Sequence, residues 1–433
     1  MSRILAFSAS LAAIAAPLAA SAQDLAVTNA TLAKGDGSEP VEGATVLVQA
    51  GKVVAVGVGV AVPAGVETVD GTGKWVTPGI FAAVSDMGLW DVQAVGDSND
   101  LSADKSPFNA SLDVVPALNP ANEHIAVSRE GGVTRASVTP FPGNAIFAGQ
   151  GALIDLGADA RLVDKPRAFQ FVVLGEGGAR EAGGSRMSAH VTLRNALREA
   201  KALAGASASA ERASDALLTH ADAMALAPVL SGEQALYVHV ERASDIRAVL
   251  AIKSEFPALK LVLIGASEGW MVANEIAASG VPVLTMPLRD LPEQFEVLGA
   301  TQSNVGRMVQ AGVKVGIGLF VGDNQPRRAA EQAGNLVALT KLPGATGLTW
   351  AQAFAAITSI PAEISGMGGK EGVLAPGAVG DVVIWDGDPL ELSSAPEAVY
   401  IDGVKQPFDS HQARLRERYK DLDRTYLPKA YSW

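Results

Sequence analysis

The sequence predicts an α/β protein with a TIM-like (β/α)8 barrel and a small composite β-sandwich domain built from both chain ends. Three observations favour this fold. The centre of the chain alternates short apolar segments with amphipathic helical stretches, and Val-rich, Gly-punctuated segments flank that centre on both sides. The chain of 433 residues also has room for a barrel of roughly 250 residues and a smaller second domain.

The chain starts with a segment typical of a secretory signal peptide. Arg3 gives a basic start, residues 4–19 are apolar, and Ala20-Ser21-Ala22 supplies the small residues of a cleavage site. We therefore expect cleavage after Ala22 and a periplasmic location. The alternative, an uncleaved anchor helix, is disfavoured because the apolar run is short. The absence of cysteine agrees with an oxidising compartment and excludes disulfides, thiolate nucleophiles and Cys-ligated metals.

Composition and charge restrict the partners. The chain is 48% hydrophobic and 18% charged, as in globular proteins, and its formal charge is −12. Removal of the signal segment, which carries one arginine and no acid, would leave a charge near −13. Nucleic acid and anionic membrane surfaces both require a basic patch, so we expect neither as a partner once the signal is removed. A small-molecule ligand is expected instead.

The two flanking segments read as β-structure. In residues 25–75, "TVLVQAGKVVAVGVGVAV" places β-branched runs on either side of a tight turn at Gly51. A similar pattern returns in residues 372–406. The domain boundaries that follow are 1–22 for the signal peptide, 23–78 and 372–407 for the two parts of the composite domain, 79–371 for the barrel and 408–433 for a helical tail.

Eight candidate strands lie in the central region, and near-continuous apolar strands of this kind are typical of a closed parallel barrel. They are residues 80–86, 133–138, 152–156, 169–174, 235–240, 259–264, 281–286 and 313–318. The stretch "ASDIRAVLAIKSEF" is a predicted helix in which Ser244 is a candidate N-cap. The tail sequence "SHQARLRERYKDLDRTY" predicts a charged helix.

On these segments the chain resembles the amidohydrolase superfamily, in particular its imidazolonepropionase-like branch. The residues that carry the resemblance are "GKVVAVG", "VDGTGKWVTPG", residues 119–156, "LYVHVERASDI", residues 359–391 and "VYIDG". Together they extend over nearly all of the chain after residue 22. The terminal segments are the most specific part, because this superfamily divides its small β domain around the barrel.

The resemblance implies hydrolysis of non-peptide C–N bonds by a metal-activated water. Similar proteins place a His-x-His pair on the first barrel strand, because residues two apart point the same way at the barrel mouth. Further ligands come from a Lys on the fourth strand, His on the fifth and sixth strands, and Asp on the eighth.

Most of these ligand positions carry other residue types here. The corresponding residues are Val84 and Asp86 on the first strand, Phe171 on the fourth, His239 on the fifth, Gly265 after the sixth, and Leu319 or Phe320 after the eighth. A register error on the sixth and eighth strands stays open. It would not restore a sixth-strand ligand, because no histidine lies between His239 and His411.

Asp86 and His239 are therefore the candidate catalytic residues and the candidate metal ligands. A catalytic zinc normally takes three protein ligands, so a third would have to come from Glu268 or Asp323 on the following loops. The structural alternatives are a core histidine at position 239 and a turn-capping aspartate at position 86. His124, in a helical pattern, is expected as a solvated surface residue.

Residues 141–154, "FPGNAIFAGQGALI", predict a structured loop on the mouth side of the barrel. Asn144 and Gln150 in this segment are candidate substrate-binding residues, together with Glu268 and Asp323. The alternative is that the two amides satisfy backbone groups of the loop itself.

The predicted function is that of a hydrolase-family protein with a degenerate metal site and reduced or lost hydrolysis. The cofactor would be a single divalent ion, Zn or Mn, or none. The alternative is a non-catalytic periplasmic small-molecule-binding or scaffold protein, either homo-oligomeric or in a hetero-oligomer with an active relative.

Overall fold

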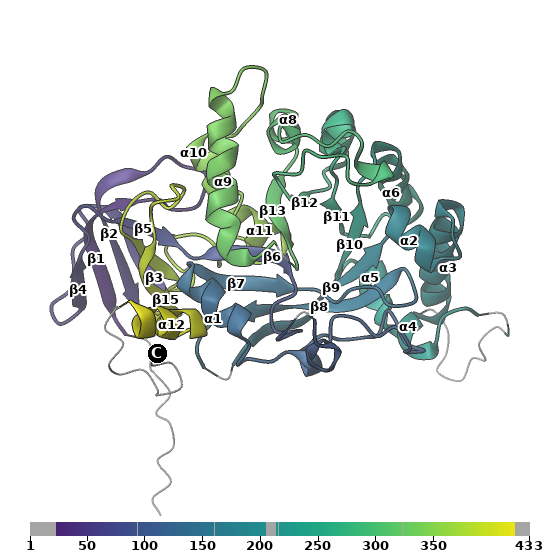
Figure 1. Cartoon of the computed structure of the whole chain (residues 1–433), viewed down its shortest axis with the longest axis horizontal. Coiled ribbons are helices and arrows are strands. Elements are labelled where there is room, and N and C mark those ends of the chain that lie inside the picture. Colours follow the sequence, from purple (N-terminus) through teal and green to yellow (C-terminus); the bar gives the residue numbers. More distant parts are fainter. Residues whose placement is uncertain are drawn as a thin grey trace, which may run out of the picture.

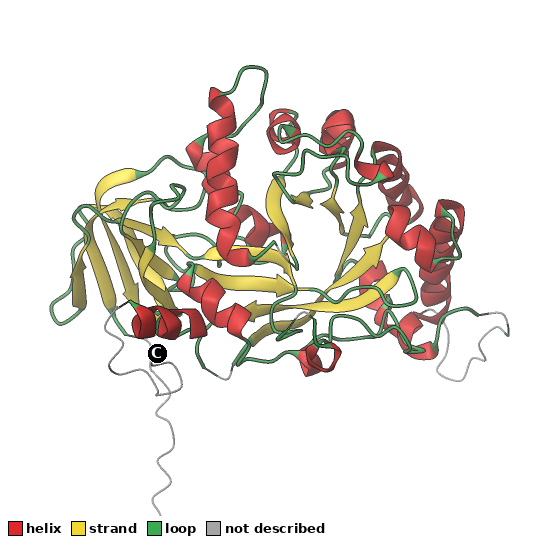
Figure 2. Ribbon diagram, in the orientation of Figure 1, coloured by secondary structure: helices red, strands yellow, loops and turns green. Residues whose placement is uncertain are grey.

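The computed structural model describes residues 23–92, 94–159, 161–204, 214, 216–322 and 324–420. The expected signal peptide, Asp323 and residues 421–433 of the expected tail lie outside these ranges. The described strands form two sheets, and helices surround the larger one (Figures 1 and 2). Within the described ranges, no helix combines the length and the apolar character needed to cross a bilayer.

The larger sheet is a closed eight-stranded barrel with the order β10-β11-β12-β13-β6-β7-β8-β9. Each predicted central strand corresponds to one strand of this barrel, so the predicted fold class is confirmed. The strands are β6 (Ile80–Ser85), β7 (Val133–Val138), β8 (Phe147–Asp155), β9 (Val163–Val173), β10 (Ala235–Val240), β11 (Leu261–Gly265), β12 (Val283–Thr285) and β13 (Val315–Phe320).

One barrel strand departs from the parallel arrangement. Strand β8 runs antiparallel to both β7 and β9, with Ala136 paired to Ile154 and Gly149 to Phe171. The connections on either side of β8, residues 139–146 and 156–162, are too short for the crossover of a dozen or more residues that parallel neighbours need. The prediction of a mouth loop over residues 141–154 is therefore wrong for most of that segment.

Two hydrophobic clusters lie on the two faces of the barrel wall. The inner cluster includes the stacked rings of Phe169 and Tyr237, whose centroids are 4.2 Å apart. The outer cluster joins the strands to the surrounding helices, for example through Ile246 and Val249. Burial on both faces explains why these strands have continuous apolar sequences.

The described helices lie mainly outside the barrel (Figure 2). The α-helices are α1 (Glu123–Glu130), α2 (Gly175–Glu181), α3 (Arg186–Ala204), α4 (His220–Ala225), α5 (Ala227–Ser231), α6 (Ala243–Glu255), α7 (Ala273–Ser279), α8 (Asn304–Gln310), α9 (Ala329–Ala338), α10 (Trp350–Ala355), α11 (Ser359–Ile364) and α12 (His411–Tyr419). The 3-10 helices are η1 (Gly96–Ser98), η2 (Val115–Ala117), η3 (Gly269–Val272), η4 (Phe295–Val297), η5 (Pro326–Arg328) and η6 (Leu339–Lys341).

Helix α6 starts differently from the prediction. Its N-cap residue is Arg242, which makes no side-chain cap, and Ser244 lies exposed inside the helix. The carboxylate of Glu268 takes the capping role instead, because its Oε2 accepts the Ala243 N–H at 2.9 Å. The predicted Ser244 cap is therefore wrong: the acceptor comes from the loop after β11.

The smaller sheet combines strands from both chain ends, as expected. Its order is β16-β15-β14-β5-β1-β2-β3, and β4 pairs with β1 outside this path. The bounds are β1 (Leu25–Leu32), β2 (Val41–Gln49), β3 (Lys52–Val58), β4 (Glu67–Asp70), β5 (Trp75–Pro78), β14 (Val382–Trp385), β15 (Pro396–Ile401) and β16 (Val404–Lys405).

Local turn geometry and a separate core organise the smaller sheet. Strands β2 and β3 are joined by Ala50 and Gly51, both with positive φ (48° and 75°), which is the two-residue turn that suits a twisted hairpin. At the edge strand β3, Val53 N–H donates to the carbonyl of Ala378 at 3.0 Å. The smaller sheet has a hydrophobic core of its own, which includes Val46 and Tyr400.

A buried ionic network joins the barrel to the smaller sheet. Arg135 on β7, 4% exposed in its side chain, donates to Asp381 before β14, to Asp164 on β9 and to Asp402 after β15, with N···O distances from 2.7 to 3.0 Å. Asp155 on β8 lies 3.7 Å from the same guanidinium. One cation therefore faces four carboxylates at this junction.

Candidate functional site

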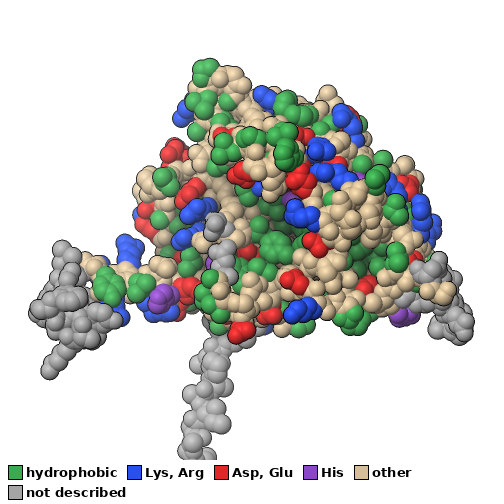
Figure 3. Space-filling model, turned by 45° about the vertical axis from the view of Figure 1, so that its right-hand side comes forward, with side chains coloured by type: hydrophobic (Ala, Val, Ile, Leu, Met, Phe, Trp, Pro, Cys, Tyr) green, Lys and Arg blue, Asp and Glu red, His purple; other side chains and the backbone are tan. Residues whose placement is uncertain are grey.

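The carboxyl ends of the parallel strands define the mouth of the barrel, and in barrels of this kind the functional side chains lie there. Here the mouth is formed by the segments that follow β6, β10, β11, β12 and β13. Figure 3 shows one hollowed face of the molecule, with hydrophobic side chains at its floor and charged side chains of both signs around it.

Three positions at which the resemblance implies metal ligands carry apolar side chains that pack together. Val84 at the end of β6 and Phe171 on β9 belong to the hydrophobic cluster inside the barrel, and the partly buried Leu319 on β13 packs against it. Val84 and Phe171 are buried, at 0% and 3% exposure. An apolar cluster stabilises the barrel interior, but it offers no lone pairs to a cation.

The backbone at this end of the barrel is strained. Val84 has φ 57°, Leu319 has φ 61° and Ala266, directly after β11, has φ 50°. The left-handed region is unfavourable for residues with a Cβ, above all for a β-branched valine, and such residues concentrate at functional sites. The Ser137 hydroxyl supports the kink at Val84 by accepting its N–H at 2.7 Å.

A polar group of four side chains, which we call the rim cluster, lies at the ends of β10 and β11 and in the loop after β12. It consists of His239, Glu241, Ser267 and Arg289. Glu241, 3% exposed, accepts from His239 Nε2 at 3.2 Å and from Arg289 Nη1 at 3.1 Å through Oε1. Its Oε2 accepts the N–H and the hydroxyl of Ser267 at 2.8 and 2.7 Å.

The rim cluster sets the protonation of its members. Burial by itself would lower the pKa of His239, but the hydrogen bond and negative charge of Glu241 outweigh burial and raise that pKa. Burial by itself would raise the pKa of Glu241, but His239, Ser267 and Arg289 together lower it. The contact therefore favours the protonated form of His239 and the ionised form of Glu241.

The Glu241 carboxylate also occupies the space above Gly265, the position at which the resemblance implies a sixth-strand histidine. A Cβ on Gly265 would lie 2.6 Å from Glu241 Oε1 and 2.7 Å from its Cδ. Gly265 further has φ 88°, which residues with a Cβ rarely adopt. A glycine is therefore required here as long as Glu241 keeps its place.

A second ionic group lies next to the rim cluster. Arg186 at the start of α3 donates to Asp245 at 2.8 Å and to Glu296 at 3.1 Å. The same Glu296 oxygen accepts the backbone N–H of Glu176 in α2 at 2.6 Å. Burial raises the pKa of Glu296. These bonds fix η4, and with it the loop after β12, against α2 and α3.

The sequence model of the amidohydrolase family matches residues 188–405, which is half of the chain. The chain belongs to the amidohydrolase family. The matched part contains the rim cluster and the strands from β10 to β15, so the resemblance read from the sequence is confirmed.

A curated relative and a solved structure agree with this assignment. Amidohydrolase tasK of Hapsidospora irregularis is 26% identical over 372 residues, which are 78% of this chain and 37% of that protein. The amidohydrolase chain thus spans little more than a third of that relative's length. An amidohydrolase of Thermotoga maritima MSB8 is 26% identical, with a TM-score of 0.77 over 88% of this chain and 99% of the other.

More distant solved structures share the fold of this family member. Molinate hydrolase has a TM-score of 0.55 at 16% identity, over 90% of this chain and 95% of its own. A prolidase complexed with N-methylphosphonate-L-proline has a TM-score of 0.53 at 17% identity, over 88% of this chain and 99% of its own. At these identities the likeness concerns the fold alone.

Asp86 of this amidohydrolase lies in surroundings different from those of His239. It is 4% exposed, and its Oδ2 accepts the Gly322 N–H at 2.8 Å. Burial raises its pKa, although Gly322, Trp90 and nearby His124 act in the opposite direction. His124 is half-buried, and its ring lies 4.2 Å from that of Trp90. The expectation of a solvated His124 is therefore wrong.

The candidate substrate-binding residues are dispersed. Glu268 is 8% exposed and has both oxygens bonded to backbone amides, of Ala243 in α6 and of Gly299 at 3.1 Å. Asn144 is an exposed loop residue that donates to the Ser106 carbonyl. Gln150 lies on β8 and accepts from Gln234 just before β10, at the amino end of that strand. Asp323 is outside the described residues.

Among the described residues, the donor set at the mouth does not fit a divalent ion of the kind the family implies. Within the described ranges, no three His, Asp or Glu side chains are grouped so that they could hold a metal. His239 directs its Nε2 to Glu241, and the ligand position at Gly265 has no side chain. The described residues at the mouth therefore support no metal-dependent reaction step.

His239 was predicted from the sequence, but Glu241, Ser267 and Arg289 were not. Glu241 follows His239 by two residues, so the two side chains point the same way from the strand, and this spacing was the available signal. Ser267 and Arg289 come from other loops, 26 and 48 residues beyond Glu241, and no local pattern links them.

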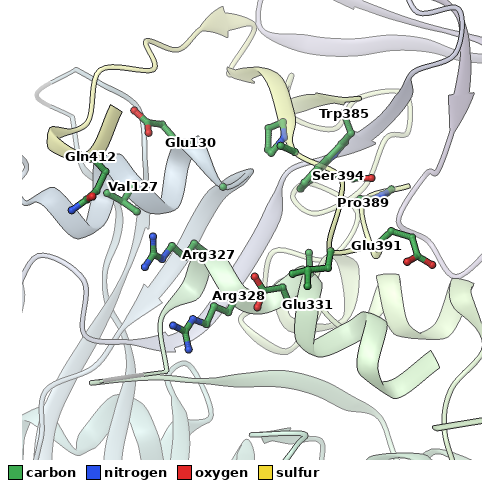
Figure 4. A pocket seen from close by; sticks show the side chains of 15 residues that line it. Val127, Glu130, Arg327, Arg328, Glu331, Trp385, Pro389, Glu391, Ser394 and Gln412 are labelled. Carbon is green, nitrogen blue, oxygen red and sulfur yellow. The ribbon is translucent and has the colours of Figure 1, made fainter. Parts of the chain in front are cut away.

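A further pocket of about 450 Å³ lies away from the mouth, among α1, α12, the start of α9 and the β14–β15 connection. Figure 4 shows Arg327, Arg328 and Glu331 along one side and Trp385 and Ser394 along another. The arginines and Glu331 are exposed, and the charges are mixed. None of the described residues that line this pocket is a buried acid, base or nucleophile.

Proposed function

We propose that this amidohydrolase-family protein has reduced or lost metal-dependent hydrolysis of non-peptide C–N bonds, and that its barrel mouth binds a small molecule. In this proposal the mature protein acts in the periplasm. The rim cluster orients the ligand, and no cation activates water.

The observation that carries this proposal is the packing of Val84, Phe171 and Leu319 into one hydrophobic cluster. Each stands where the resemblance implies a ligand, so the first, fourth and eighth strands contribute apolar surface there. Apolar side chains at the mouth favour burial of ligand surface and disfavour a hydrated cation.

The rim cluster supports the same conclusion from a second direction. His239, the remaining histidine at a ligand position, is bonded to a carboxylate that is itself fixed by Ser267 and Arg289. A histidine must be neutral to bind a metal, and Glu241 favours its protonated form.

Metal analysis of the mature protein, purified without chelator and then tested with a panel of cyclic amides, addresses the proposal. We expect zinc and manganese well below one ion per chain, and no turnover above that of the free ions when either metal is added. His239→Ala should change neither result.

A stoichiometric zinc or manganese ion that is lost in His239→Ala, together with hydrolysis that is lost in the same variant, would refute the proposal. The Asp222→Asn variant is a suitable control, because Asp222 binds the backbone of the 109–111 segment and lies on α4, away from the rim cluster.

A further inference from the structure

We infer that the barrel mouth binds an organic carboxylate with an apolar chain, the carboxylate at Arg289 and the apolar part along the loop after β12. This inference rests on the proposed binding function and names its ligand class. It follows from the hydrogen-bonding capacity that the rim cluster leaves unused.

The carboxylate of the rim cluster is fully used as an acceptor. Glu241 receives four hydrogen bonds, two on each carboxylate oxygen, from His239, Arg289 and the two donors of Ser267. An ionised carboxylate has about four lone-pair sites, so Glu241 has none left for a ligand. A donor-rich or cationic ligand would find no acceptor at this carboxylate.

The donors of Arg289 are mostly unused. A guanidinium carries about five N–H groups in a fixed fork. In the part of the chain that the structure describes, only Nη1 of Arg289 makes a protein hydrogen bond, and the side chain is 23% exposed. The ring of His239 likewise makes a hydrogen bond through Nε2 and none through Nδ1 to any described residue.

The unused N–H donors of Arg289, next to a Glu241 carboxylate that can accept no further bond, suit a negatively charged oxygen of a ligand. A planar guanidinium fork binds a carboxylate through two parallel N–H···O bonds, and the positive charge strengthens both.

The loop that carries Arg289, residues 286–303, also presents apolar side chains. Leu291, Phe295 and Leu298 are 62%, 77% and 62% exposed. Three large hydrophobic side chains at such exposure give this loop apolar area that a ligand can remove from water. The loop is held in place by Glu296, which bonds to Arg186 and to α2. A chain attached to the carboxylate can therefore pack on a fixed apolar surface.

Isothermal titration calorimetry of the mature protein with octanoate, octanamide and acetate tests this inference. Octanoate should bind at least about tenfold more tightly than octanamide, which has the same chain without the charge, and more tightly than acetate, which lacks the chain. Arg289→Gln should remove the preference for octanoate over octanamide, and Arg289→Lys should retain part of it.

Phe295→Ala should weaken octanoate binding and leave the weak binding of acetate unchanged. This variant alters an exposed side chain, so it remains informative if Arg289→Gln does not fold. Arg328→Gln, which changes an exposed arginine in the pocket of Figure 4, should bind octanoate like the unmodified protein.

Equal affinity for octanoate and octanamide, unchanged binding in Arg289→Gln, or no octanoate binding at all would overturn the inference. These outcomes are separate from the metal and hydrolysis measurements. If the protein holds no metal and does not bind octanoate, only the inferred ligand class is refuted. If it holds a metal and hydrolyses cyclic amides, the proposed function is refuted.

Discussion

Glu241 is the residue on which the arrangement of the mouth depends. Its carboxylate binds His239, Ser267 and Arg289, and it fills the space above Gly265. A buried carboxylate is costly unless it is paired, and here it is paired with two bases and two further donors. A change at Glu241 should therefore affect both stability and the protonation of its neighbours.

Glu241→Gln should destabilise the protein by about 1–3 kcal/mol, because Arg289 loses its carboxylate partner in a largely buried setting. It should also lower the pKa of His239, since the charge that raises it is gone. Urea unfolding and NMR titration of the imidazole measure the two effects. Glu275→Gln, in an exposed pair with Arg247, is the control and should leave both unchanged. An unaltered His239 pKa in Glu241→Gln would contradict this account.

Gly265→Ala tests the close approach of Glu241. Gly265 and Gly312 both have φ 88°, but a Cβ on Gly312 meets nothing within 4 Å. Gly312→Ala should therefore cost about 1 kcal/mol for the left-handed backbone alone. Gly265→Ala should cost about 1–3 kcal/mol more, because Glu241 must also move. If thermal or urea unfolding showed the same loss of unfolding free energy in both variants, Glu241 would be able to move aside at no cost, which contradicts this account.

At the scale of elements, the strand pattern was readable from the sequence, but strand direction was not. Residues 152–156 are apolar enough to be recognised as a strand, but residues 147–151 contain Gly149, Gln150 and Gly151 and were expected as part of a loop. An apolar run also has the same appearance in either direction. Only the short connections on both sides of β8 limit it to the antiparallel arrangement. This is why the mouth loop expected at residues 141–154 was wrong.

The beginning of α6 illustrates the same limit for helix caps. Ser244 is a good capping residue by type. The Ala243 N–H is nevertheless bonded to Glu268, which lies 25 residues after Ala243 in the chain. Caps that come from another element have no local signal. Glu268 was recognised as a carboxylate near the mouth, and its role as a substrate-binding residue stays a prediction.

Glu268→Ala should destabilise the protein by about 1–3 kcal/mol, because it leaves the N–H groups of Ala243 and Gly299 without acceptors. Hydrogen exchange should speed up at the first turn of α6 and at Gly299. Glu293→Ala, an exposed residue of the loop after β12, is the control and should alter neither. Unchanged exchange at α6 would mean that Glu268 does not act as the cap.

At the scale of the whole molecule, Arg135 connects the barrel with the smaller sheet, and buried carboxyls near it control how stability responds to pH. Burial raises the pKa of Asp155 to about 7 and that of Glu371 to about 8, although the positive charge of Arg135 acts in the opposite direction. Both carboxyls therefore hold a proton in the folded protein at a pH where the unfolded chain has already lost it.

Stability should fall as pH rises from about 4.5 to 8, because in this window the folded state binds more protons than the unfolded state. The slope should be on the order of 1 kcal/mol per pH unit for each fully shifted group. Asp155→Asn mimics the protonated carboxyl and should flatten the decline in urea midpoints, as should Glu371→Gln. Asp97→Asn, at an exposed site, is the control. Stability that rises over this range would contradict the raised pKa values.

The glycine at position 265 has a consequence for attempts to redesign the chain. A histidine placed there would collide with the Glu241 carboxylate, so that substitution is tolerated only after position 241 has been cleared. The two changes are therefore ordered, and the first one sacrifices stability before any metal-binding gain exists. No single substitution at position 265 therefore adds a ligand to the mouth, and a redesign has to change positions 241 and 265 together.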